Sequence, residues 1–323
     1  MDSLFHLPPE LFRHIIDMMD LHDEFVLSQT GRGLRCVFSR NWDEALAQLS
    51  PEDRLRFWAG LASISPDHWA CPRCCRLHRV DTSDTPSTPQ DPPCGAQLSL
   101  RRISEGGYSL RQNHMQTALK LSRMGNSHQE YLARLMSPHR FSFTTECVFQ
   151  PQIRETYTAK PRIINGRFIL REEWVITDEK NVARPLLHNI IIPSCPHLCV
   201  IGKGVINSKY WKRRGGRLAR QANPNAREII LLEEAIENAI RYRGVSIICS
   251  CPRCPTDYEV CVSESGRMAT IRAWHDFGGE GTPMDTGLNL HVRNAGVSDW
   301  IDQGPRSGHV PGSIERLWLD THR

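Results

Sequence analysis

The sequence predicts an α+β protein, in which an N-terminal helical region and further helices precede a domain built on an antiparallel sheet. Near the N-terminus, apolar residues recur at three- and four-residue spacing, as on one face of an amphipathic helix. From residue 141 onward apolar and polar residues alternate, and Asn165-Gly166 and Ser265-Gly266 separate alternating runs as hairpin turns do. Cysteines paired beside prolines add clusters that look like zinc knuckles.

The first predicted helix begins at Pro8 and Pro9, because a proline at the first helical position loses no N–H that the helix needs. Its apolar side chains form one broad face: Leu11, Phe12, Ile15, Ile16 and Met19. About forty residues cannot enclose this much apolar surface alone, because small domains bury a low fraction of their area. We therefore expect this face to need a partner. The alternative is an ordinary helical hairpin packed on its own domain.

The segment from Leu4 to Trp42 resembles the F-box. The resemblance is carried by Leu7-Pro8-Pro9-Glu10-Leu11, Ile15, Ile16, Leu34, Arg35 and Trp42. It implies a three-helix module, residues 1–48, that binds a Skp-family adaptor and tethers the chain to a cullin ubiquitin ligase. The adaptor-binding residues that it implies are Leu7, Pro8, Leu11, Ile15, Ile16 and Leu34. Gly31 and Gly33 depart from the family pattern, and each costs about 1 kcal/mol of helix propensity relative to alanine, so the third helix is expected to be short or late.

Composition describes a globular protein of about two domains. Of 323 residues, 40% are hydrophobic and 24% are charged, and basic residues exceed acidic ones by four, which is too few to indicate nucleic acid. The apolar runs are too short to cross a bilayer, and the N-terminus lacks a signal-peptide pattern. We expect an intracellular protein, in the cytoplasm, the nucleus or both, with no membrane partner.

Residues 49–108 are predicted to hold a helix, a cysteine-rich segment and a flexible loop. Ser50-Pro51-Glu52-Asp53 is a helix start, with a serine cap and acids in the first turn. Cys71 and Cys74 place two thiolates on one tight turn, as a tetrahedral zinc requires, and His78 and Cys94 are the candidate third and fourth ligands. Residues 81–93 are rich in Pro, Ser, Thr and Asp, and indicate an exposed loop or disordered linker. The alternative for this cluster is free buried cysteines.

Residues 109–323 are predicted to form an α+β domain that recognises a target protein. Residues 110–136 are expected to be helical with a cap at Gly125, and residues 228–242 form an amphipathic helix that ends at Gly244. Strands are expected at 141–145, on either side of Asn165-Gly166 within 162–170, at 174–176 as an extension of the second of these, and at 258–262 and 269–274. A short final helix is expected at 313–319.

A second zinc site is predicted from two segments far apart in the chain. Cys195-Pro196-His197 follows an apolar run, and so does Cys251-Pro252-Arg253-Cys254. Side by side they would supply one tetrahedral set, Cys195, His197, Cys251 and Cys254. Cys199 and Cys249 are spare candidates, and unrelated cysteines near strand ends are the alternative. In a reducing compartment, clustered cysteines indicate metal rather than disulfides.

The later motifs are similar to those of one family of filamentous fungi, whose members carry an F-box and a cysteine-rich C-terminal region. The matching segments here are Cys71 to His78, Cys195 to Leu198, Cys251 to Tyr258 and Trp274 to Gly278. This resemblance implies an architecture for the C-terminal domain and no particular activity.

Motifs of common catalytic sites are absent from the sequence: there is no Gly-x-Ser-x-Gly, no Walker A loop and no His-Glu-x-x-His. A zinc with four protein ligands keeps no open position for water, so both sites are expected to be structural and the chain to be no enzyme. We expect the substrate-receptor subunit of a Skp–cullin–F-box E3 ubiquitin ligase. The alternatives are a zinc-stabilised nucleic-acid-binding protein that uses the basic and aromatic residues 209–217 and, third, a zinc hydrolase.

Overall fold

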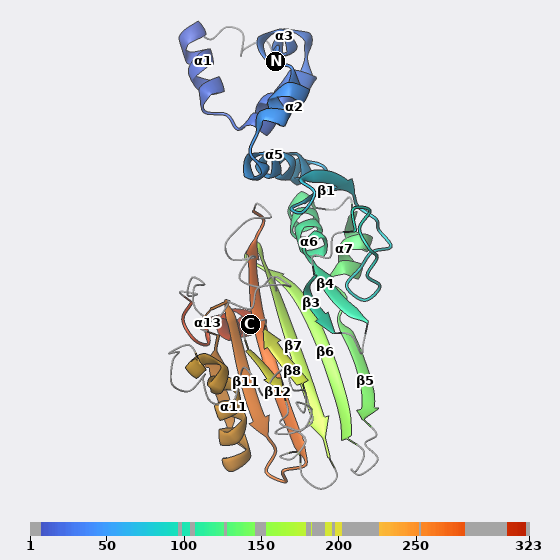
Figure 1. The fold of residues 1–323 in the computed structure, drawn as a ribbon, viewed down its shortest axis with the longest axis vertical. Helices are drawn as coiled ribbons and strands as arrows, with labels where there is room; N and C mark the ends of the chain where they lie inside the picture. Colours follow the sequence, from blue (N-terminus) through green and yellow to red (C-terminus); the bar gives the residue numbers. More distant parts are fainter. Residues whose placement is uncertain are drawn as a thin grey trace, which may run out of the picture.

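In the computed structural model, N-terminal helices are joined through a small hairpin to a domain built on a large antiparallel sheet (Figure 1). The structure describes residues 8–95, 99–103, 107–125, 128–145, 153–178, 182, 191–195, 198–201, 226–251, 253–281 and 309–320. Within these residues the predicted combination of helices with an antiparallel sheet is confirmed.

Four short helices begin the described chain: α1 (Pro9–Asp17), α2 (Leu21–Thr30), α3 (Arg32–Val37) and α4 (Trp42–Gln48). The third is short, as Gly31 and Gly33 predict, with six residues and Gly31 as its N-cap. The next helix, α5 (Pro51–Ile64), begins where expected, because Ser50 Oγ accepts from the Asp53 N–H at 3.1 Å. Phe25 of α2 packs edge-on against Phe57 of α5 at 5.7 Å, so α5 shares an aromatic core with the helices before it.

A hairpin that the sequence did not predict, β1 (His68–Cys71) and β2 (Arg76–Arg79), links α5 to the rest of the protein. Leu55 and Ala62 of α5 pack on Ala70 of β1. Helix α6 (Gln112–Met124) holds this junction from the other side. Its side chains donate to backbone carbonyls of the junction: Gln116 to Ala70, Lys120 to Ser65 and His68, and Arg123 to Ser63.

The segment 81–93 is a loop, as predicted, but it is anchored in the protein. Asp84 is buried, and its Oδ1 lies 2.9 Å from His114 Nε2 while its Oδ2 accepts from Asn113 Nδ2 at 2.8 Å. Tyr131 of α7 (Gln129–Leu135) donates to the Asp84 carbonyl at 2.8 Å. A buried carboxylate with several partners holds the loop in one position. The low apolar content of the segment gave no sign of this anchoring. A second small hairpin, β3 (Ser99–Ile103) and β4 (Tyr108–Arg111), follows.

The large sheet has the strand order β10-β11-β12-β7-β6-β5, with every neighbouring pair antiparallel. Its strands are β5 (His139–Thr145), β6 (Ile153–Ile164), β7 (Arg167–Thr177), β10 (Ser246–Ser250), β11 (Thr256–Val262) and β12 (Met268–Gly279). The Asn165-Gly166 hairpin between β6 and β7 is confirmed, with positive φ at both residues, and so is the β11–β12 hairpin.

Helices cover both faces of this sheet. On the main core face lie α6, α7 and α11 (Ala226–Arg241), whose Leu232, Ala235, Ile236 and Ala239 are buried. The small sheet β8 (Ile191–Cys195) and β9 (Leu198–Ile201) also contributes to this core through Cys195. On the opposite face, α13 (Ser313–Asp320) packs Ile314 and Trp318 on Trp274. Among the described residues, no helix is both long and apolar enough to cross a bilayer.

Candidate metal centres

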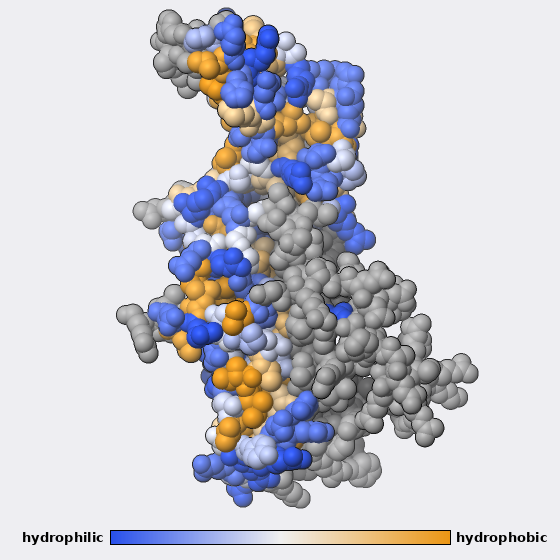
Figure 2. Space-filling model, turned by 90° about the vertical axis from the view of Figure 1, so that its left-hand side faces the viewer, coloured by the Kyte–Doolittle hydropathy of each residue, from blue (hydrophilic) through white to orange (hydrophobic). Residues whose placement is uncertain are grey.

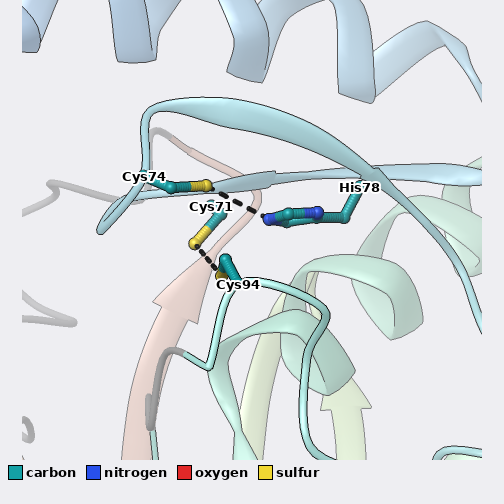
Figure 3. Close-up of side chains that lie close together, drawn as sticks. All are labelled: Cys71, Cys74, His78 and Cys94. Carbon is teal, nitrogen blue, oxygen red and sulfur yellow. Dashed lines mark hydrogen bonds between the residues drawn. The ribbon is translucent and has the colours of Figure 1, made fainter.

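The structure brings together all four side chains of the first predicted zinc site. The ligand atoms of Cys71, Cys74, His78 and Cys94 lie within 4.8 Å of one another (Figure 3). Cys71 Sγ lies 3.7 Å from Cys94 Sγ, and Cys74 Sγ lies 3.2 Å from His78 Nε2. A tetrahedral zinc with bonds of about 2.0–2.3 Å separates its ligand atoms by about 3.5–3.8 Å, so the donor set fits this metal in type and spacing.

The β1–β2 hairpin positions three of these ligands, and the anchored loop 81–93 delivers Cys94. Cys71 ends β1, and the turn that follows returns the chain sharply, with Cys75 at φ 49° and its N–H bonded to the Cys71 carbonyl at 2.9 Å. The ring of Trp69 lies 5.0 Å from that of His78 and orients it. Burial, with a contribution from Arg76, lowers the pKa of His78, which favours the neutral imidazole that a metal requires. Burial raises the pKa of Cys71 to about 12.

The second cluster consists of three cysteines in the main core: Cys195, Cys251 and Cys254 have their sulfur atoms within 4.8 Å of one another. Cys195 ends β8, and the other two lie in the turn between β10 and β11. Burial raises the pKa of Cys195 and Cys254 well above the usual thiol value. His197, the predicted fourth ligand, lies outside the described residues, as does the side chain of Cys199. Cys249, the other spare candidate, is not part of the described cluster.

The two cysteine turns share the tetrapeptide Cys-Pro-Arg-Cys and a common backbone contact. In the second turn the N–H of Arg253 points at Cys251 Sγ over 3.5 Å. In the first, the N–H groups of Cys74 and Arg73 lower the pKa of Cys71 against the effect of burial. Backbone N–H groups directed at sulfur stabilise thiolates, which are the form that binds metal.

A run of buried polar side chains adjoins the second cluster, and sequence reasoning missed it. Cys254 Sγ lies 3.2 Å from Thr256 Oγ1, which lies 3.1 Å from His275 Nδ1. His275 Nε2 lies 2.7 Å from Glu172 Oε2, and the Tyr157 hydroxyl donates to Glu172 Oε1 at 2.5 Å. A signal existed in the sequence: strand alternation places Glu172 in line with Leu170 and Trp174, which face the main core.

Thr256, His275 and Glu172 have the order of groups found in hydroxyl–imidazole–carboxylate catalytic triads. All three are 0% exposed, however. Since no substrate reaches the Thr256 hydroxyl in this arrangement, its geometry does not support nucleophilic catalysis.

The predicted adaptor-binding residues divide into exposed and buried ones. Leu11 and Ile15 are 54% and 37% exposed, Pro8 is exposed and Ile16 is half-buried. Leu34 is 8% exposed, so its side chain is not on the free surface. Leu7 lies outside the described residues, and so do the basic and aromatic residues 209–217.

A cleft of about 1190 Å³ lies between the N-terminal helices and the tip of the β6–β7 hairpin. Asp53 and Gly60 line one side, and Gly166 lines the other. Two arginines on its wall are ion-paired, Arg123 with Glu280 and Arg167 with Asp276. The exposed lining of the cleft is more apolar than polar, and it indicates no particular ligand.

Comparison of the chain with models of protein families, with curated proteins and with solved structures finds no match.

Proposed function

We propose that the chain is the substrate-receptor subunit of a Skp–cullin–F-box E3 ubiquitin ligase, with the N-terminal helices docking a Skp-family adaptor. The main support is the apolar surface of α1 and its C-cap residue Met18, where Leu11, Ile15 and Met18 are 54%, 37% and 68% exposed. Figure 2, which views the side on which α1 lies, has hydrophobic side chains at the surface of the N-terminal helices. In an ordinary hairpin packed on its own domain these side chains would be buried, whereas an adaptor that covers them explains their exposure.

Zinc is the metal that we propose for both clusters, in a structural role. Thiolates together with imidazole are preferred zinc ligands, and four protein ligands at Cys71, Cys74, His78 and Cys94 keep no position for water. At the second cluster the cysteines are 0–1% exposed, which separates a bound metal from solvent. The chain therefore acts by proximity: it holds a target protein near the ubiquitin carrier and contributes no catalytic residue of its own.

The test is co-expression with a Skp-family adaptor, followed by gel filtration and zinc analysis of the same fractions. Leu11→Asp places a carboxylate on the proposed interface, and Leu319→Asp is the matched control, since Leu319 is 52% exposed on α13. We expect two zinc ions per chain, co-elution of wild type and control with the adaptor, and binding at least about 100-fold weaker for Leu11→Asp, because an unpaired buried charge costs several kcal/mol. Equal binding of both variants, or a folded wild type that does not bind, would contradict the proposal.

A further inference from the structure

A run of polar side chains is buried in the otherwise apolar core, from Cys254 through Thr256, His275 and Glu172 to Tyr157. Burying such groups is unfavourable to the free energy of folding. Removing an imidazole and a carboxylate from water costs several kcal/mol unless each is paired and hydrogen-bonded. The side chains around them on the same sheet face are apolar and pack well, such as Leu170, Trp174, Ala273 and Phe277. Packing alone therefore does not require polar groups at these positions.

Three neighbouring strands hold the run rigidly. Thr256 of β11 lies directly opposite His275 of β12, and Glu172 of β7 lies opposite Ala273, two residues before His275. Glu172 accepts from Tyr157 on one oxygen, and its other oxygen lies 2.7 Å from His275 Nε2. The imidazole is thereby fixed with its Nδ1 directed at Thr256 Oγ1. Each contact in the series restricts the next, and the last restricted atom is the Thr256 hydroxyl.

That hydroxyl lies 3.2 Å from Cys254 Sγ, on the side of the second cluster. A metal-bound thiolate keeps lone pairs that accept hydrogen bonds. The single O–H of Thr256 serves this thiolate when His275 donates from Nδ1 to Thr256 Oγ1 and from Nε2 to Glu172. Such outer contacts orient ligands and tune their affinity. Thr256 is also tied to the turn itself, since its carbonyl accepts from the Cys251 N–H at 2.8 Å and its N–H donates to the Cys254 carbonyl at 2.7 Å.

We propose that Thr256, oriented by His275 and Glu172, is a positioning residue for Cys254 as a metal ligand at the Cys195–Cys251–Cys254 cluster. The inference rests on the proposed zinc at this cluster. It adds a role that the ligand set alone does not contain: the sheet core fixes the sulfur atom before the metal arrives, so less of the binding free energy is spent on ordering the ligand.

The test measures zinc affinity at each cluster by chelator competition on the full chain. Thr256→Val removes the hydroxyl at nearly constant volume, and Thr256→Ser keeps it. We expect Thr256→Val to weaken zinc binding at the second cluster about 10–100-fold, the range for loss of an outer-shell partner. Thr256→Ser should restore most of the affinity, and zinc at Cys71, Cys74, His78 and Cys94 should be unchanged as an internal control. With cobalt in place of zinc, the sulfur-to-metal charge-transfer band should shift in Thr256→Val and not in Thr256→Ser.

A merely structural role for Thr256 predicts a different result: the metal-free and metal-bound proteins lose stability equally, and neither affinity nor spectrum changes. That outcome would overturn the inference and leave the zinc assignment intact. A wild type that binds no metal at the second cluster would overturn both. If Thr256→Val does not fold, His275→Gln takes its place, because it moves the group that orients Thr256; an unchanged affinity there also contradicts the proposal.

Discussion

Lys120 is a buried charge at the junction between the N-terminal helices and the sheet domain. It is 3% exposed, and its ammonium group donates to the carbonyls of Ser65, at 2.7 Å, and of His68. Burial lowers its pKa from 10.5 to about 8. The side chain thus satisfies carbonyls at the end of α5 and the start of β1, at the cost of removing a charge from water.

This pKa makes stability depend on pH in a defined window. Between pH 8 and pH 10.5 the unfolded chain holds a proton on Lys120 that the folded chain has lost, so stability rises with pH across the window and is flat below it. The shift corresponds to about 3 kcal/mol. Lys120→Met removes this contribution. Urea denaturation of both proteins at pH 7.5 and pH 10 should show the wild type gaining stability relative to the variant, and parallel behaviour would contradict the burial of the charge.

At the residue scale, the first cluster of candidate metal ligands could be predicted from the sequence because three of its four side chains lie on one short turn and hairpin. Cys94 was predicted as well, although only the contacts of Asp84 with His114 and Asn113 explain why the loop returns it to the site. The support of Cys254 by Thr256 could not be predicted, because it depends on cross-strand neighbours that are distant in sequence.

At the element scale, α13 depends on one carboxylate of the sheet. Asp257 of β11 is 0% exposed and accepts from the N–H groups of Gly312, Ile314 and Glu315 at 3.0, 2.8 and 3.2 Å. A side chain distant in sequence therefore caps this helix. Burial would raise the pKa of Asp257, but the hydrogen bonds from His309 and these N–H groups lower it overall. Its contribution to stability is present above the ordinary carboxyl range and is lost as pH falls through the lowered value.

Asp257→Asn should detach α13 while the sheet stays folded. The substitution removes the charge and half of the acceptor capacity, and a buried N–H without a partner costs about 1–3 kcal/mol. The exposed Arg316 then becomes a faster site for trypsin, which mass spectrometry detects as release of residues 317–323. Asp320→Asn, on the exposed end of the same helix, is the control. Cleavage at equal rates in both variants would show that Asp257 does not hold the helix.

Elements with a strong local signal could be predicted, and those without one could not. Asn165-Gly166 specified its hairpin because both residues tolerate positive φ, and the period of α11 predicted its buried face. The β1–β2 hairpin has only four residues in each strand and lacks apolar alternation. In β1, His68 is partly buried and the next three residues are all buried, so burial does not alternate either. Cys71 and Cys74 lie at its turn, so the local signal in the sequence was that of a cysteine pair rather than of a strand.

At the scale of the whole molecule, the sheet order was not predictable from the sequence. The central pair β7 and β12 joins residues about 100 positions apart, such as Trp174 and Ile271, and no local pattern selects that partner. The same arrangement decides where the clusters lie. The first cluster is on the hairpin that packs against α5, and the second is inside the main core.

Loss of a ligand should therefore have different consequences at the two clusters. Cys94 is exposed and Cys251 is 0% exposed. Cys94→Ser should free the β1–β2 hairpin and increase tryptic cleavage after Arg73, Arg76 and Arg79, without loss of the sheet domain. Cys251→Ser should open the sheet domain, with cleavage after Arg267, because a bound metal at about 1,000 times its dissociation constant contributes about 4 kcal/mol and the buried thiols lose their partner.

Adaptor binding distinguishes local opening of the hairpin or of the sheet domain from unfolding of the whole chain. Leu11 and Ile15 lie on α1, and neither is part of the hairpin packing or of the main core. Both cysteine variants should therefore retain the adaptor in gel filtration, while zinc analysis shows the loss of one ion from each. Identical cleavage patterns in the two variants would mean that the clusters stabilise one cooperative unit. Distinct cleavage patterns, with the same adaptor affinity in both variants, would assign a metal at the first cluster to the connection between the N-terminal helices and the sheet. A metal at the second cluster would then be assigned to the sheet domain itself.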